Sequence, residues 1–295
     1  MLKGRYENSN MGMKVVQWIG IVFILTAVVM VIWSYVPDRQ SVAHLKAVQV
    51  MQTLSMFLLP SFIVAYLWSE QPVAWLHLDR LVSWKEVVWG LCFILIAAPG
   101  INLLADLNSH WGLPAFLEPI EAMMKQMEVN AALLTEKFLQ MDSLWALLVN
   151  LLVMALLPAL SEELCFRGVM TNLFYGNNET TKNNKMHIAI WVVAVLFSAM
   201  HMQFDGFVPR MLLGAVFGYA LWWSGSLWLP IWMHFVNNSL AVISAYMEQR
   251  GVIDADVTDQ LGTGDTLWLG IVSIVLSVIM LYVLRKQADV SFEKM

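Results

Sequence analysis

Residues 161–167 read Ser-Glu-Glu-Leu-Cys-Phe-Arg and place three ionisable side chains inside a stretch that is otherwise apolar. The apolar stretch extends from Leu144 to Phe174, which is long enough to cross a bilayer as a helix. A charged side chain in hydrocarbon costs at least about 2.5 kcal/mol, so such residues normally face a bundle interior or a water-filled cavity and mark function. The stretch therefore predicts a membrane-spanning helix that carries a functional site.

The three charged side chains differ in the partners that a helix offers them. Glu163 and Arg167 are four residues apart with the acid first, which favours a salt bridge between them. Glu162 and Arg167 are five apart and point about 140° away from each other. Glu162 therefore lacks a charge partner on its own helix and is the candidate general base. The alternative is that both acids only pair with cations on neighbouring helices.

The composition of the whole chain is that of a polytopic helical membrane protein. Of 295 residues, 59% are hydrophobic and only 13% are charged. The net charge of −5 comes without a basic cluster, so nucleic acid is not an expected partner. Cys92 and Cys165 lie in apolar stretches and form neither a disulfide framework nor a CxxC metal signature, so we interpret both as packing residues.

The apolar stretches predict an all-α fold with about eight transmembrane helices and the active site inside the helix bundle. The first stretch is too long for the hydrophobic region of a usual signal peptide, so we expect it to be retained. The predicted spans are roughly Val15 to Tyr35, Ala47 to Trp68, Glu86 to Leu104, Leu144 to Phe174, Ile188 to Met202, Phe207 to Trp223, Pro230 to Met247 and Thr266 to Leu284.

Lys and Arg in the connections set the expected orientation. With the amino terminus inside, ten of them lie in cytoplasmic segments, five lie outside, and Arg167 and Arg210 lie in spans, which accounts for all 17. We therefore expect an integral protein of the plasma (inner) membrane with both termini cytoplasmic.

Three connections are long enough to interpret. Glu118 to Met141 carries apolar residues at helical spacing, which predicts an amphipathic helix on the outer surface, with a solvated loop as the alternative. Gly251 to Asp265 has no apolar period and is expected as a plain loop. On the inner side, Gly176 to Lys185 is expected as a polar turn.

Two of the six histidines lie inside predicted spans and extend the candidate site. His201 follows Phe197 by four residues, and His234 precedes Asn238 by four. The second spacing places an imidazole and an amide on one helical stripe, where both can reach a single atom. Asn237, three residues from His234, could substitute for Asn238 geometrically.

The sixth predicted span carries small and charged residues of a different kind. Gly214 and Gly218 form a small-xxx-small pair, which predicts close helix packing. Asp205 and Arg210 flank the outer end of this span, where they either mark the interface or support His201.

The ordered set of charged and polar residues resembles the CPBP family, which comprises CAAX prenyl proteases of the second type and bacteriocin-processing or immunity enzymes. The residues that carry the resemblance are Glu162-Glu163-x-x-x-Arg167, Phe197-x-x-x-His201 and His234-x-x-x-Asn238, on three separate spans. It covers about Ser143 to Ala245. We accordingly divide the chain into a three-span region with its outer connection (1–142), a catalytic core (143–247), and an outer loop, last span and tail (248–295).

The resemblance implies an intramembrane endopeptidase whose substrate is a membrane protein or peptide. Glu162 would activate a water, His201 would assist or orient it, and His234 with Asn238 would stabilise the oxyanion. The remaining residues of the pattern would be structural: Glu163, Arg167 and Phe197.

The metal dependence and the reaction class each have an alternative. Glu162, His201 and His234 could form a His₂Glu zinc site, but no HExxH helix is present, and we favour a metal-independent glutamate mechanism without a cofactor. A non-proteolytic scaffold or immunity protein of the same fold and a proton-coupled carrier are the other classes. A base and an oxyanion pair on three helices favour the enzyme, since a scaffold needs neither.

Glu162 and His201 must lie at the same depth in the membrane to form one site, and this requires a long fourth helix. If this span entered the lipid at Leu144, Glu162 would lie about 27 Å along it, near the cytoplasmic face and out of reach of His201. We therefore expect a helix from about Ser143 to Phe174 that begins outside the hydrocarbon or is strongly tilted.

Overall fold

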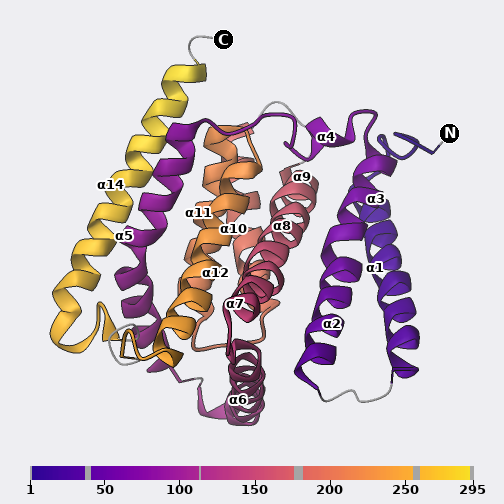
Figure 1. Ribbon diagram of the computed structural model, residues 1–295. Coiled ribbons are helices and arrows are strands. Elements are labelled where there is room, and N and C mark those ends of the chain that lie inside the picture. The colour runs from indigo at the N-terminus through magenta and orange to yellow at the C-terminus, as the bar shows by residue number, and fades with distance from the viewer. Residues whose placement is uncertain (1, 37–40, 113, 176–181, 255–259, 293–295) are drawn as a thin grey trace.

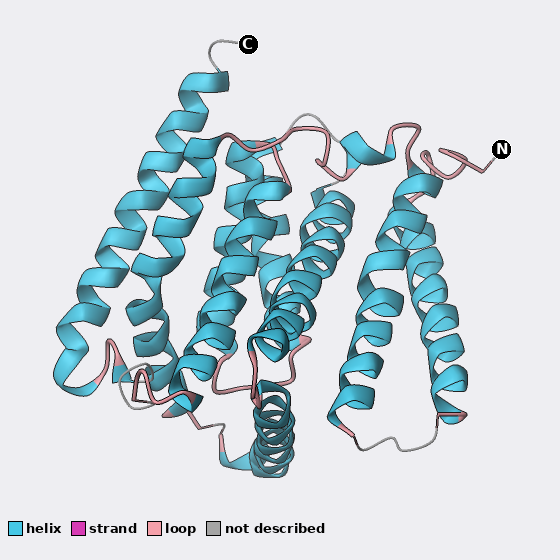
Figure 2. Ribbon diagram, viewed as in Figure 1, coloured by secondary structure: helices cyan, strands magenta, loops and turns pink. Residues whose placement is uncertain are grey.

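The computed structural model describes residues 2–36, 41–112, 114–175, 182–254 and 260–292, and every regular element in these ranges is a helix. Figures 1 and 2 show helical stretches that run up and down the bundle, one at each predicted span. These are α1 (Met11–Ser34), Val42–Trp68, α5 (Trp84–Ser109), Leu144–Tyr175, α10 (Lys182–Ala199), α11 (Phe207–Ser224), α12 (Trp228–Gln249) and α14 (Leu267–Phe292). The prediction of an all-α polytopic membrane fold is confirmed.

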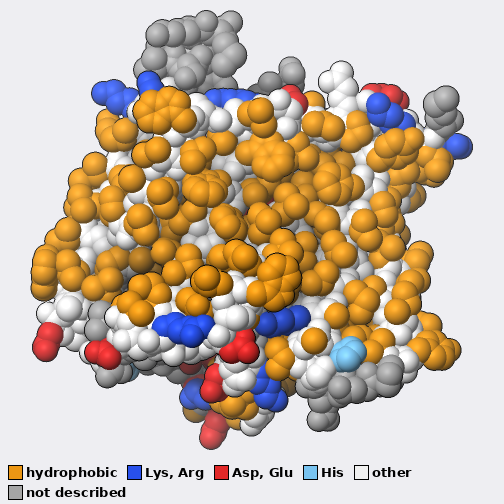
Figure 3. Space-filling view, in the orientation of Figure 1, with side chains coloured by type: hydrophobic (Ala, Val, Ile, Leu, Met, Phe, Trp, Pro, Cys, Tyr) orange, Lys and Arg blue, Asp and Glu red, His pale blue; other side chains and the backbone are white. Residues whose placement is uncertain are grey.

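Five of the described helical stretches are long and apolar enough to cross a membrane. They are Met11–Ser34, Val42–Trp68, Trp84–Ser109, Leu144–Tyr175 and Gly264–Ala288, and α10 contributes a shorter apolar helix, Asn184–Ala199. Figure 3 shows hydrophobic side chains over the middle of one face and most charged side chains toward its two ends. This is the surface expected of a protein embedded in a bilayer, while the count of eight spans stays a prediction.

Two of the long stretches combine α-helix with π-helix. The second consists of α2 (Val42–Thr53), η1 (Leu54–Leu58) and α3 (Leu59–Trp68). The fourth consists of α7 (Leu144–Asn150), η3 (Leu151–Leu156), α8 (Leu157–Glu163), η4 (Leu164–Met170) and α9 (Thr171–Tyr175). The expected long fourth helix is confirmed, and Glu162 lies near its middle.

Prolines account for two of these π segments. Pro60 and Pro158 each come two residues after a π segment, and neither has an N–H to donate to the carbonyl four residues earlier. The ladder adapts by i→i−5 bonds: the N–H of Leu59 donates to Leu54 O, and that of Leu157 donates to the oxygen of Leu152.

The predicted amphipathic connection forms α6 (Glu118–Leu139), which follows the 3₁₀ turn η2 (Ala115–Leu117). Figure 1 shows it lying across the end of the bundle opposite both chain termini, which we call the α6 end. Its last turn is fastened to the bundle because Asn150 donates to Phe138 O over 2.7 Å and Gln249 donates to Leu139 O over 2.6 Å. The helical interpretation of this connection is confirmed.

The other two interpreted connections agree with the structure only in part. After α12 the chain makes a turn at 251–253, and a 3₁₀ turn, η6 (Gly264–Thr266), precedes α14, whereas residues 255–259 lie outside the described residues. In the expected polar turn, residues 176–181 lie outside the described residues, and α10 already begins at Lys182. Helix α10 therefore includes the polar residues before the apolar period.

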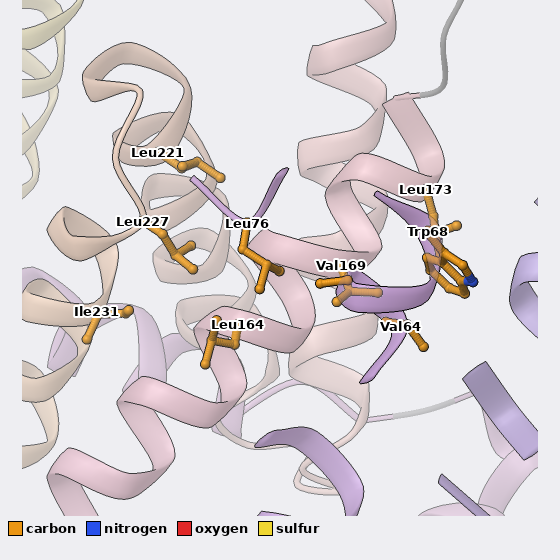
Figure 4. Packing of buried hydrophobic residues seen from close by; sticks show 10 residues of the cluster. Val64, Trp68, Leu76, Leu164, Val169, Leu173, Leu221, Leu227 and Ile231 are labelled. Carbon is orange, nitrogen blue, oxygen red and sulfur yellow. The ribbon is translucent and has the colours of Figure 1, made fainter. Parts of the chain in front are cut away.

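A buried apolar cluster fixes η4 against its neighbours (Figure 4). Leu164 and Val169 are fully buried in it, between residues of α3 on one side and of α11 and α12 on the other. The partners are Val64, Ala65, Trp68, Leu76, Leu173, Leu221, Leu227 and Ile231, with Leu76 contributed by the segment after α4 (Pro72–Trp75). Cys165 is buried against Phe166, as expected of a packing residue, but Cys92 is exposed on α5 and the packing interpretation was wrong for it.

Candidate active site

The centre of the bundle holds a carboxylate that accepts two hydrogen bonds through one oxygen. Oε1 of Glu163 lies 2.9 Å from Nη1 of Arg167 and 2.9 Å from Nδ1 of His234. The side chain of Glu163 is 0% exposed and that of Arg167 is 1% exposed. The predicted salt bridge is confirmed, whereas the bond to His234 was not predicted because helical spacing says nothing about contacts between spans.

Arg167 connects this centre to α11 and to aromatic rings. Its Nη2 donates to the backbone oxygen of Gly214 over 2.8 Å, and its guanidinium carbon lies 4.4 Å from the ring centroid of Phe197 and 5.5 Å from that of Phe217. A Cβ on Gly214 would lie 3.1 Å from Nη2 and 3.1 Å from the Phe197 ring. The close packing predicted for this glycine therefore makes room for the guanidinium as well as for a helix.

Glu162 lies beside this centre without sharing its bonds. Its Oε2 is buried and has no hydrogen-bond partner among the described residues. The charges that act on it come from His234 and Glu163, and then from Arg167 and Arg210. The sequence-based distinction between a paired Glu163 and an unpaired Glu162 is thus reproduced in the structure.

The bond to Glu163 determines which nitrogen of His234 is available. Since a carboxylate accepts, Nδ1 carries the proton and Nε2 is the ring atom left for other partners. The ring stacks on Phe217 at 5.4 Å between centroids and meets the ring of Phe197 edge-on at 5.9 Å. His234 is therefore held on both faces and at one nitrogen.

His201 lies just past the end of α10 instead of within a span. The helix ends at Ala199, and His201 is an exposed residue of the following turn. Its Nδ1 donates to the backbone oxygen of Phe197 over 2.8 Å, which leaves Nε2 as an acceptor. The Phe197 ring lies 5.0 Å from the His201 ring and also contacts His234, so it separates the two imidazoles.

Asn238 is attached to the fourth helix through a carbonyl that Pro158 leaves without its usual donor. Nδ2 of Asn238 lies 3.5 Å from the backbone oxygen of Met154, the residue four before the proline. Its Oδ1 accepts from Nδ2 of Asn237 over 3.3 Å. Asn237 therefore lies against the Asn238 amide and holds its oxygen.

The proposed zinc ligands do not assemble in the described part of the chain. Among those residues, no group of three or more His, Cys, Asp or Glu side chains is placed so that it could hold a metal ion. This applies to Glu162, His201 and His234, so the residues present do not fit the alternative zinc site.

Comparison with known proteins identifies the same region. Residues 144–240 match the family model described as type II CAAX prenyl endopeptidase, Rce1-like. The match runs from the start of α7 into α12 and contains every residue of the predicted site, from Glu162 to Asn238. No curated protein and no solved structure matches the chain.

The buried carboxylate of Glu163 predicts that removing its charge destabilises the protein more than removing an exposed charge. Glu163→Gln keeps the shape of the side chain but leaves Arg167 and His234 without their anion, so the free energy of unfolding should fall by about 3–5 kcal/mol. Thermal unfolding in detergent measures the loss. Lys125→Gln removes one charge from the exposed i,i+4 pair with Glu121 and serves as the matched control, with little change expected. Equal melting temperatures for the two variants would contradict this role of Glu163.

Proposed function

On the premise that residues 144–240 form an Rce1-like domain of the CPBP family, we propose that the protein is an intramembrane endopeptidase that hydrolyses a peptide bond of a membrane-associated protein or peptide. The observation that carries the proposal is the unpaired Oε2 of Glu162 beside the fixed imidazole of His234. A carboxylate oxygen that is buried without a hydrogen bond is expensive, and general-base catalysis gives it a purpose.

Glu162 takes a proton from a water molecule, whose oxygen attacks the carbonyl carbon of the scissile bond. Nε2 of His201 accepts the other hydrogen of this water and orients it, because Nδ1–H is already donated to Phe197 O. When the C–N bond breaks, Glu162 returns its proton to the leaving amine. The glutamate ends in its starting state, and no cofactor is required.

His234 and Asn238 stabilise the negative oxygen that develops in this step. With Nδ1–H donated to Glu163, the ring donates a second hydrogen bond, from Nε2, as an imidazolium. Asn238 supplies an amide N–H from the same stripe of α12. Each preorganised donor of this kind is typically worth about 10²–10³ in rate.

An apolar cavity supports a substrate with a hydrophobic group. A cavity of about 490 Å³ lies between α1, η1, η4 and α10, and its wall includes Cys165 and Phe166, two and three residues after Glu163. The ring centroids of Phe166 and Phe197 lie 5.2 Å apart, and the backbone oxygen of Phe197 accepts the hydrogen bond from His201. A prenyl group or an apolar segment in this cavity would reach the vicinity of the site from within the membrane.

We place the protein in the plasma membrane with both termini in the cytoplasm. The ten-against-five distribution of Lys and Arg supports this orientation. Both chain ends lie at the same end of the bundle in Figure 1, as an even number of crossings requires.

The role of Glu162 is tested by removing only its basic oxygen. Glu162→Gln should lower cleavage by at least about 10²-fold, because the amide cannot take the proton from water, while the protein still inserts and folds. Mass spectrometry of membrane peptides from cells with either protein provides the measurement. Glu136→Gln, on the exposed face of α6, is the control for the same chemical change. Unchanged peptide profiles in the Glu162 variant would refute the assignment.

The metal-free mechanism predicts resistance to chelation. Protein treated with a strong chelator and shown by elemental analysis to be free of zinc should retain its activity. Activity that disappears on chelation and returns with Zn²⁺ would establish the zinc alternative.

The oxyanion pair predicts non-additive losses. His234→Ala and Asn238→Ala should each lower turnover more than substrate binding, and the double variant should lose less free energy of activation than the sum of the two. Asn237→Ala should be milder, because Asn237 acts only by orienting the Asn238 amide. Turnover numbers for the three single variants and the double variant are the measurement. Strictly additive losses would show that His234 and Asn238 do not act on the same oxygen.

A further inference from the structure

Arg210 is a cation in the first turn of α11 that no acid neutralises directly. Its Nη2 donates to Oε1 of Gln203 over 2.8 Å, and its Nη1 lies 3.4 Å from the backbone oxygen of the same residue. Among the described residues it forms no ion pair within 4.0 Å. Its charge nevertheless acts on Glu162 and on His201, so it lies beside the proposed reaction centre.

The charges of Glu128 and Glu162 act on Arg210, but neither acid forms an ion pair with it within 4.0 Å, so its charge is only partly compensated. The first turn of a helix carries the positive end of the helix dipole, where an additional cation is destabilised. The side chain is also partly buried, which removes part of its hydration. A ligand that carries a negative charge would offset both the repulsion from the helix dipole and the loss of hydration.

The acids near Arg210 are engaged elsewhere. Glu128 of α6 accepts from the backbone N–H of Asp205 over 3.2 Å and is also hydrogen-bonded to the Asp205 side chain. Burial and the neighbouring Asp205 charge raise the pKa of Glu128, so this pair retains a proton more readily than an isolated acid. Glu162 is the proposed base, so its negative charge is lost while it holds the proton taken from water.

The connection that presents Arg210 is held in one conformation. Asn108 of α5 donates to Phe204 O over 3.0 Å and accepts from the backbone N–H of Val208 over 2.8 Å. Ser198 donates to Phe207 O over 2.7 Å, and Met202 adopts a positive φ of 54°. A non-glycine residue in this conformation persists only where its surroundings enforce it, so Arg210 is presented at a defined place.

The separation of Arg210 from the reaction centre suits the end of a short peptide. Arg210 precedes Gly214, which accepts from Arg167, by one helical turn, or about 6 Å along α11. An extended peptide advances about 3.3–3.6 Å per residue, so two residues span about 7 Å and three span about 10 Å. The first distance matches this offset, and the long side chain of Arg210 can cover the remainder of the second.

We propose that Arg210 binds a carboxylate of the substrate, two or three residues from the scissile bond, through a charge-assisted hydrogen bond to its guanidinium. This inference rests on the proposed function, because it assigns part of the substrate to that site. Two sources share this chemistry: the α-carboxylate at the carboxyl end of the substrate, and an acidic side chain near that end.

The test compares three forms of one prenylated synthetic CAAX peptide. The first ends in a free carboxylate, the second ends in an amide, and the third is an amide with Glu as its last residue. Binding is measured by fluorescence anisotropy on the full-length Glu162→Gln protein, in which the peptide stays intact, and cleavage is measured on the wild type. Arg210→Gln and Arg210→Lys are compared in both backgrounds, with Arg250→Gln as the matched control for another arginine at the α6 end.

In the Glu162→Gln protein with Arg210 intact, the amide peptide should bind about tenfold to a hundredfold more weakly than the free-carboxylate peptide. This is the usual effect of losing a hydrogen bond between charged groups. This preference should disappear in Arg210→Gln, persist in part in Arg210→Lys, and remain in Arg250→Gln. Restored binding of the third peptide would show that any carboxylate suffices. Binding as weak as that of the second peptide would assign the site to the α-carboxylate.

Equal binding of the acid and amide forms, or an equal loss for both forms in Arg210→Gln, would overturn the inference. The second result would show that Arg210 only maintains Glu162 or the fold. A wild type that binds the acid peptide selectively but cleaves none of the three would refute the proposed function for this substrate and leave the carboxylate site standing.

Discussion

The structure depends on one buried carboxylate oxygen, Oε1 of Glu163, which accepts from Arg167 and His234 at the same distance of 2.9 Å. A guanidinium in the interior of a membrane protein is costly unless an anion is placed beside it. Since Arg167 also donates to Gly214 O, the cluster joins the fourth helix to α11 and α12. It fixes the rotation of three helices about their axes, which an apolar contact could not do as specifically.

The same interaction separates the roles of two neighbouring acids. Successive residues of a helix point about 100° apart, so the helix that turns Glu163 toward Arg167 turns Glu162 away from it. Oε1 of Glu163 holds the guanidinium and the imidazole, whereas Glu162 forms a bond to neither of them. Among the described residues, Oε2 of each acid is buried without a hydrogen bond. In the proposed mechanism, Glu163 orients His234, and Glu162 exchanges protons with water.

The sequence was informative wherever a single helix decides the outcome. It predicted the all-α fold, the amphipathic α6, the long fourth helix and the bridge between Glu163 and Arg167, all of which depend on periodicity or on i,i+4 spacing. It was less reliable where tertiary contacts decide. His201 lies in a turn because α10 ends at Ala199, and nothing in the apolar pattern marks that boundary. Cys92 faces outward because an apolar side chain in a membrane span can equally well face lipid.

The backbone of the fourth helix explains why spacing alone could not complete the site. The segment that carries Glu162, α8, lies between two π segments, η3 and η4, and each wider turn changes the direction in which later side chains point. Carbonyls of this helix also accept from side chains: Met154 O accepts from Asn238, and Phe166 O accepts from both the N–H and the hydroxyl of Thr171, the latter at 3.0 Å. Pro158 thus does more than interrupt a ladder of hydrogen bonds. By removing the donor for Met154 O, it provides the contact that attaches Asn238 of α12 to the fourth helix, so a backbone irregularity places one of the two proposed oxyanion donors.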